Sequence, residues 1–102
     1  MSTLDITTKV RNVIKDDEKL KSEIERISLF GSQLHGTATA KSDVDLLVTF
    51  NPDAHVGLFR LVAIERLFAE KLQKKVDLVT PRALSKYFRE VVLSEATPLY
   101  ER

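Results

Sequence analysis

The feature that most constrains the fold is the run VDLLVTF at residues 44–50. Its β-branched and aromatic side chains are typical of a strand that is buried on at least one face. The turn-forming sequence Asn51-Pro52-Asp53 follows it and predicts that the strand stops there. A chain with such a strand must build the rest of its core around it.

Acidic side chains interrupt this apolar strand at its start. Asp43 and Asp45 are two residues apart, and side chains alternate between the faces of a strand, so both carboxylates are expected on one face. Two like charges on one face repel unless a cation lies between them. Hard divalent cations such as Mg²⁺ take carboxylate oxygens and substrate phosphates as ligands. The other interpretation is that this is the solvated side of a half-exposed strand.

Further strands and helices are predicted on both sides of this run. Short apolar stretches that end at Gly31 and Pro81 predict strands at residues 26–30 and 76–80. Apolar residues recurring every three or four positions predict helices at residues 6–25 (open to a break near Asp16-Asp17), 57–73 and 83–96, the last ended by Pro98. The order of these elements predicts an α/β (α+β) fold with a mixed sheet of at least three strands packed with helices. At 102 residues, a single domain spanning 1–102 is expected.

The composition excludes several classes of protein. With 16 basic and 15 acidic side chains the net charge is +1, which does not favour a non-specific nucleic-acid binder. Without cysteine, disulfides and thiolate metal sites are excluded, and the chain suits a reducing cytoplasm. No apolar run approaches the length of a membrane span. Between Lys71 and Arg89 six basic residues accompany one acidic residue, which indicates a solvated face or a positive field beside an anionic ligand.

Asp77 repeats the pattern of an acidic residue within an apolar strand, between Val76 and Leu78. If the strands that contain Asp45 and Asp77 are neighbours, three carboxylates converge on one place. Such a cluster would form the wall of a two-metal site. Taken alone, Asp77 is equally consistent with a solvated strand face.

A Gly-Ser pair closes the strand that precedes the acidic one. Gly31 allows the backbone to come close to a ligand, and a helical turn starting at Ser32 would offer free N–H groups and a hydroxyl to an anion. A phosphate chain held there could reach metal ions bound by Asp43 and Asp45. By itself the pair is typical of a simple turn.

Together, LFGS, SDVDLLV and KVDLVT, with ten residues between Ser32 and Asp43, form a more specific pattern. The chain resembles the minimal nucleotidyltransferases of the DNA polymerase β superfamily, over nearly its whole length. The resemblance implies that Gly31 and Ser32 contact a nucleoside triphosphate. It also implies that Asp43, Asp45 and Asp77 are the catalytic residues and bind two Mg²⁺ ions, and that Asp77 helps to deprotonate the attacking group.

The implied reaction is transfer of AMP from ATP to a hydroxyl group. Minimal members resemble the antitoxin half of toxin–antitoxin modules whose toxin is a HEPN-domain ribonuclease. The resemblance therefore implies an ATP-dependent adenylyltransferase whose acceptor is a tyrosine of such a toxin. One departure concerns GSQLHG, where Gln33 and His35 replace arginines that are common in the family. This puts the rate or the acceptor in question, and His35 is interpreted as a loop residue rather than a base.

Two other functions stay open on the sequence. A non-catalytic antitoxin could neutralise the toxin by covering it, which the Gln33 and His35 substitutions favour and the intact aspartates oppose. Alternatively, the acceptor could be RNA or a small molecule, which the balanced charge and the short chain disfavour.

Overall fold

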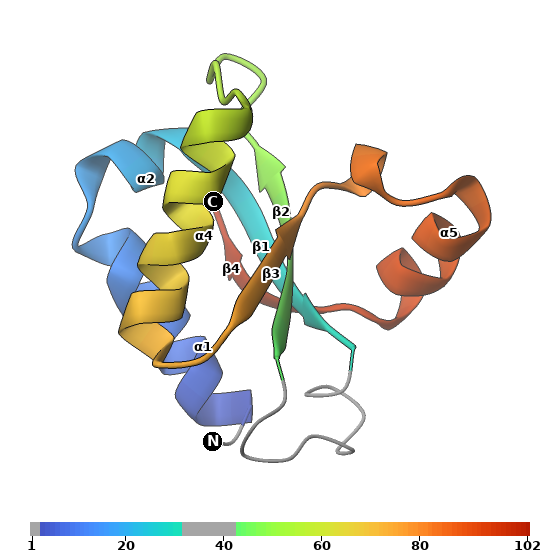
Figure 1. Cartoon of the computed structure of the whole chain (residues 1–102), viewed down its shortest axis with the longest axis horizontal. Helices are drawn as coiled ribbons and strands as arrows, with labels where there is room; N and C mark the ends of the chain where they lie inside the picture. The colour runs from blue at the N-terminus through green and yellow to red at the C-terminus, as the bar shows by residue number, and fades with distance from the viewer. Residues whose placement is uncertain (1–2, 32–42) are drawn as a thin grey trace.

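A computed structural model of the chain describes residues 3–31 and 43–102. These residues form a four-stranded mixed sheet packed with helices, as Figure 1 shows. The predicted fold class is therefore confirmed. The loop predicted after Gly31 lies outside the described residues, and with it lie the predictions for Ser32, Gln33 and His35.

The strands of the sheet are β1 (Ile24–Phe30), β2 (Val44–Phe50), β3 (Val76–Val79) and β4 (Thr97–Glu101). Their order across the sheet is β3-β2-β1-β4. Strand β1 is antiparallel to β2 and to β4, whereas β2 and β3 run parallel. The two strands that carry the predicted site aspartates are therefore neighbours, as the sequence required for a common site.

The predicted N-terminal helix is two helices, α1 (Thr3–Lys15) and α2 (Glu18–Glu23). The break falls at Asp17, whose carboxylate accepts hydrogen bonds from the backbone N–H groups of Lys19 and Leu20, at 3.0 and 3.1 Å. Satisfying these free N–H groups is what an N-cap aspartate does at the start of a helix. Asp17 therefore starts a second helix.

Helix α4 (Leu58–Leu72) matches the predicted helix to within a residue at each end. Gln73 ends it in the left-handed conformation, with φ 55°. Arg60 fixes its first turn to α2, because its guanidinium donates to both carboxylate oxygens of the buried Glu23 at 2.7 and 3.0 Å. Glu23 thereby raises the pKa of Arg60.

The predicted last helix differs from the structure at its start. The segment begins with a 3₁₀ turn, η1 (Pro81–Ala83), and helix α5 (Lys86–Glu95) starts only after Ser85. The Ser85 hydroxyl accepts a hydrogen bond from the backbone N–H of Phe88 at 3.4 Å. Ser85 is therefore the N-cap of α5 and separates this helix from η1.

The helix ends at Glu95, close to the predicted end before Pro98, but Pro98 itself lies inside strand β4, which was not predicted. Strand β4 is at the edge of the sheet, where a proline does not disrupt the strand pairing. The C-terminal segment, whose packing the sequence left open, therefore pairs with β1. The Arg102 N–H also donates to the Glu25 carbonyl at 2.9 Å.

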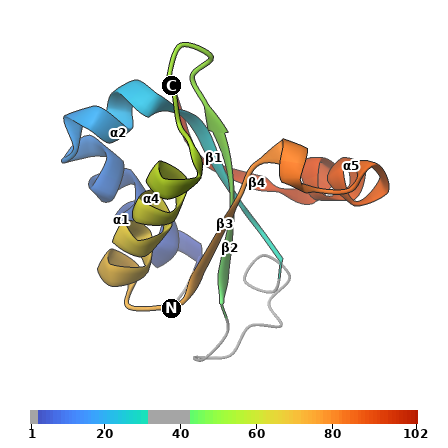
Figure 2. The same ribbon diagram turned by 45° about the horizontal axis from the view of Figure 1, so that its top comes forward.

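One face of the sheet carries the main core. Helices α1, α2 and α4 cover this face, as Figures 1 and 2 show. Alternate strand residues point into it, and burying each large apolar side chain contributes roughly 1.5–3 kcal/mol. Fully buried members of this cluster include Ile6, Val10, Ile14, Leu20, Ile27, Leu29, Val44, Leu46, Val48, Ile64, Phe68 and Leu72.

The opposite face of the sheet, called the open face below, carries the residues that alternate with those of the core. Helix α5 is the helix on that side among the described residues (Figure 2). Strands β3 and β4 are the two edges of the sheet, so the segment that joins them runs from one edge to the other on the open side. In the described part of the chain, no helix is long and apolar enough to cross a membrane.

Candidate active site

Asp45 and Asp77 lie side by side on the open face. The parallel register of β2 and β3 pairs Asp45 with Asp77, between the core pairs Val44–Val76 and Leu46–Leu78. Burial raises the pKa of the Asp45 carboxyl, and the negative charges of Asp77 and Asp43 and a hydrogen bond with Asp77 raise it further. The carboxylates of Asp45 and Asp77 therefore repel each other when both are ionised, and a cation between them would relieve that repulsion.

Gly31 packs directly against the side chain of Asp45. It has a positive φ of 80°, and a Cβ at this position would overlap the Asp45 carboxylate. A side chain at position 31 would therefore be strained and would displace Asp45. The sequence predicted only that Gly31 allows a ligand to come close, but the structure also makes it the neighbour of Asp45.

Asp43 precedes β2 and is half-buried. Its carboxylate lies 3.7 Å from the ammonium of Lys75, and the Lys75 carbonyl accepts a hydrogen bond from the Val44 N–H at 2.9 Å. Lys75 was not among the predicted site residues. The sequence spacing could have indicated Lys75, because it directly precedes β3 and lies two residues before Asp77, just as Asp43 directly precedes β2 and lies two residues before Asp45.

Glu65 is a second residue that the sequence did not single out. It lies on α4, and its carboxylate accepts a hydrogen bond from the backbone N–H of Leu78 at 2.9 Å. Leu78 follows Asp77 directly, so this bond fixes the backbone that carries Asp77. Only a long-range contact between a helix and a strand creates this role, and no local sequence signal indicates it.

The donor atoms of this site suit a hard divalent cation, because they are carboxylate oxygens with excess negative charge. In residues 3–31 and 43–102, however, no three histidine, aspartate or glutamate side chains are grouped closely enough to hold a metal ion. Asp45 and Asp77 meet, whereas Asp43 stands beside Lys75. The role of the three aspartates as metal ligands therefore stays a prediction.

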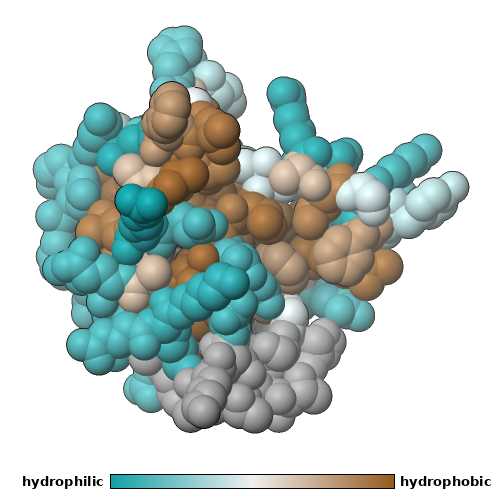
Figure 3. Space-filling view, in the orientation of Figure 1, coloured by the Kyte–Doolittle hydropathy of each residue, from teal (hydrophilic) through white to brown (hydrophobic). Residues whose placement is uncertain are grey.

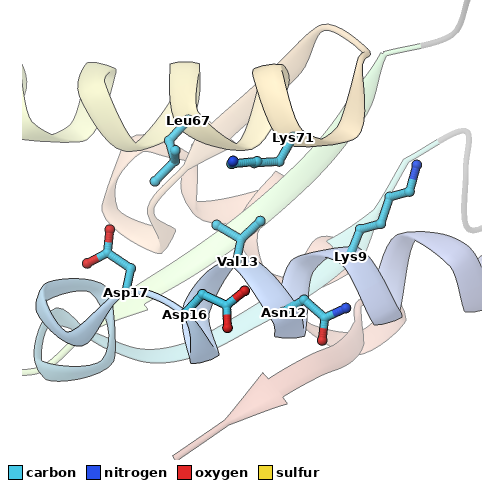
Figure 4. Close-up of a pocket in the computed structure, with 7 residues that line it drawn as sticks. All are labelled: Lys9, Asn12, Val13, Asp16, Asp17, Leu67 and Lys71. Atoms are coloured by element: carbon cyan, nitrogen blue, oxygen red, sulfur yellow. The ribbon is translucent and has the colours of Figure 1, made fainter.

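A groove of about 330 Å³ lies elsewhere, between α1 and α4 on the helical side of the sheet. Figure 4 shows Lys9 and Lys71 beside Asp16 and Asn12 around it. It contains none of the predicted site residues, and its charges are of both signs. The chemistry of the aspartates, rather than this hollow, therefore defines the candidate site.

Comparison with known proteins agrees with this geometry. The chain belongs to the nucleotidyltransferase domain family, whose sequence profile matches residues 8–99. It is thus an enzyme of the nucleotidyltransferase class, and the predicted resemblance is confirmed.

Individual relatives show which nucleotidyltransferases the chain is similar to. The protein adenylyltransferase MntA of Thermococcus cleftensis is 30% identical over 95 residues, which cover 93% of this chain and 94% of MntA. A solved structure described as a candidate minimal nucleotidyltransferase has a TM-score of 0.77 and 30% identity, and the match covers 96% of each chain.

A third match is to a tri-AMPylated Shewanella oneidensis HEPN toxin in complex with an MNT antitoxin. Its TM-score is 0.66 and its identity 21%, and the match covers 95% of this chain and 71% of the other. At this identity the likeness shows a shared fold.

Proposed function

We propose that this chain is a cytoplasmic, Mg²⁺-dependent protein adenylyltransferase that acts as an antitoxin. Its substrates would be ATP and a tyrosine hydroxyl of a HEPN-domain toxin, with which it would form a hetero-oligomer. The names of the relatives support this proposal, because MntA is a protein adenylyltransferase and one structural neighbour is an antitoxin bound to an AMPylated HEPN toxin.

The observation that carries the proposal is the Asp45–Asp77 pair on the open face, placed against Gly31. Two adjacent carboxylates destabilise each other, and a core strand that served only structure would gain from an apolar residue at either position. Their retention is explained if Asp45, Asp77 and Asp43 hold cations for the nucleotide. Bound Mg²⁺ would lower the pKa of the acceptor hydroxyl and neutralise triphosphate oxygens.

The chain's own groups would then position the reactants. Gly31 lets the triphosphate approach the backbone, and the hydroxyl of Ser32 is proposed to bind it. The acceptor oxygen forms a bond to the α-phosphorus, the bond from that phosphorus to the bridging oxygen breaks, and pyrophosphate leaves. Asp77 would accept the proton of the tyrosine. Holding the reacting atoms in line is the main contribution of such a site.

Intact-mass spectrometry tests this proposal. The chain and a HEPN-domain protein of the same organism are purified and mixed with ATP and Mg²⁺. We expect the HEPN-domain protein to gain the mass of one or more AMP groups at tyrosine. Asp45→Ala and Asp43→Ala should fold normally and lower the rate by orders of magnitude, whereas Asp53→Asn, at an exposed aspartate of the β2–α4 loop, should react like the wild type.

The same experiment separates the alternatives. A stoichiometric complex without added mass would favour the non-catalytic antitoxin, and full activity of Asp43→Ala/Asp45→Ala would refute the assigned site. Calorimetric titration of ATP with Mg²⁺ into the isolated chain gives a second readout. Binding that requires both the metal and the aspartates would establish the nucleotide site without any acceptor.

A further inference from the structure

Helix α5 has an apolar stripe that the rest of the described chain leaves uncovered. Tyr87, Phe88 and Val91 are 84%, 52% and 50% exposed, whereas Val92 beside them is 4% exposed. The three exposed residues lie at positions i, i+1 and i+4 of α5 and therefore share one side of the helix. Figure 3 shows brown, apolar atoms gathered over this helix. A contiguous exposed apolar stripe of this kind marks an interaction site.

The stripe is held in a defined position relative to the catalytic strand. Arg89 donates from Nε to the carbonyl of Pro81 at 2.7 Å and from Nη2 to the carbonyl of Leu84 at 3.2 Å. These bonds fix α5 to η1, and Pro81 is only four residues beyond Asp77. A partner bound to α5 is therefore placed relative to Asp77 through a short, hydrogen-bonded segment.

Size indicates what can occupy the stripe. A ten-residue helix is about 15 Å long and about 10 Å wide with its side chains, so one face buries roughly a few hundred Å². A stable interface needs about 1,200 Å² or more in total. Two copies of this chain paired through α5 alone would fall short of that area. The occupant must also cover a neighbouring surface, and the open face with Asp45 and Asp77 lies on the same side of the sheet as α5 (Figure 2).

We propose that the stripe formed by Tyr87, Phe88 and Val91 is the docking surface for the acceptor protein, an inference that rests on the proposed function. The occupant presents an apolar helix face to α5, because helices pair through such stripes. The same protein extends over the open face and brings its acceptor hydroxyl to Asp45 and Asp77. The docking helix then sets which protein is modified, and the aspartates set the chemistry.

Steady-state kinetics with the HEPN-domain protein as acceptor test this assignment. Tyr87→Asp/Val91→Asp places charges in the proposed interface, and we expect the KM for the acceptor to rise at least about tenfold. Calorimetric affinity for ATP with Mg²⁺ should stay unchanged, because the aspartates are untouched. The matched control is Phe59→Asp, at a 92% exposed residue of α4 on the other side of the sheet, and it should leave both quantities unchanged.

Further variants keep the outcomes separable. The milder Tyr87→Ser/Val91→Ser tests the same surface if the charged variant loses its circular dichroism signal. Asp45→Asn should abolish transfer but retain the complex, which sedimentation velocity measures. An α5 variant that modifies the acceptor like the wild type would overturn the docking assignment while leaving the proposed function intact. So would α5 variants that only dissociate a homodimer. A wild-type chain that neither binds nor modifies the acceptor would overturn both.

Discussion

The two faces of the sheet carry helices with the same spacing of apolar residues but with opposite exposure. On α4, Ile64, Phe68 and Leu72 are fully buried against the sheet. On α5, Tyr87 and Val91 are also four residues apart and are 84% and 50% exposed. The comparison teaches that the spacing of apolar residues identifies a helix face that is buried against something. It does not identify whether that something is the same chain or another protein. The chain itself covers Ile64, Phe68 and Leu72 of α4, and we expect another protein to cover Tyr87 and Phe88 of α5.

The largest expected effect sharpens this comparison through one phenylalanine on each helix. Phe68→Ala should lower the free energy of unfolding by about 3–5 kcal/mol, because it leaves a cavity in the core. Phe88→Ala should lower it by less than about 1 kcal/mol, since Phe88 is half-exposed in the isolated chain. Urea unfolding measures both, and similar losses would show that α5 is as well packed as α4.

Two arginines test how firmly the hydrogen bonds of each helix hold it in place. Arg60→Ala leaves Glu23 buried and unpaired, and we expect a loss of about 2–3 kcal/mol, less than for a fully buried pair because Arg60 is 27% exposed. Arg89→Ala frees only two carbonyls in partly exposed residues, so the loss should be about 1 kcal/mol. Thermal unfolding at neutral pH measures both, and the opposite order would contradict the view that α4 is the more firmly held helix.

Asp45→Asn tests whether the carboxylate of Asp45 lowers the free energy of unfolding. Because burial, Asp77 and Asp43 raise the Asp45 pKa in the folded chain, ionising this group costs folding free energy. Without metal, the variant should be more stable than the wild type at pH 7, by a margin that solvent screening keeps small because Asp45 is only partly buried. The gain should shrink as the pH falls through the raised pKa and vanish below the ordinary pKa of an aspartate. Unfolding curves across this pH range measure it, and a gain that persists in acid would rule out this electrostatic cause.

The smallest expected effect concerns Lys75, whose side chain is 74% exposed and whose ammonium lies 3.7 Å from the Asp43 carboxylate. Lys75→Ala should change the free energy of unfolding by less than about 0.5 kcal/mol, because exposed ion pairs contribute little. It should also raise the affinity for Mg²⁺ slightly, since Asp43 then no longer shares its charge with an ammonium group. A thermal-shift titration with Mg²⁺ measures this, and weaker Mg²⁺ binding would mean that Lys75 supports the site instead.

Much of the fold and the placement of two aspartates could be predicted because they depend on local patterns. Alternation along β2 and β3 placed Asp45 and Asp77 on the open face, and the Asn51-Pro52 turn and Gly57 bounded their elements. Strand β4 was missed because Pro98 suggests a break and because an edge strand is defined by its pairing with β1. The contact of Glu65 with Leu78 and that of Gly31 with Asp45 could not be predicted, since both join residues more than ten positions apart.

The route of the chain between β3 and β4 has a consequence for how such enzymes can diversify. Residues 81–95 begin and end at opposite edges of the sheet, and few of their side chains belong to the buried core. We therefore expect the exposed surface of this segment to tolerate substitution better than the strands that carry Asp45 and Asp77. Grafting this segment from a relative with a different acceptor should redirect the enzyme towards that acceptor while its nucleotide chemistry stays the same.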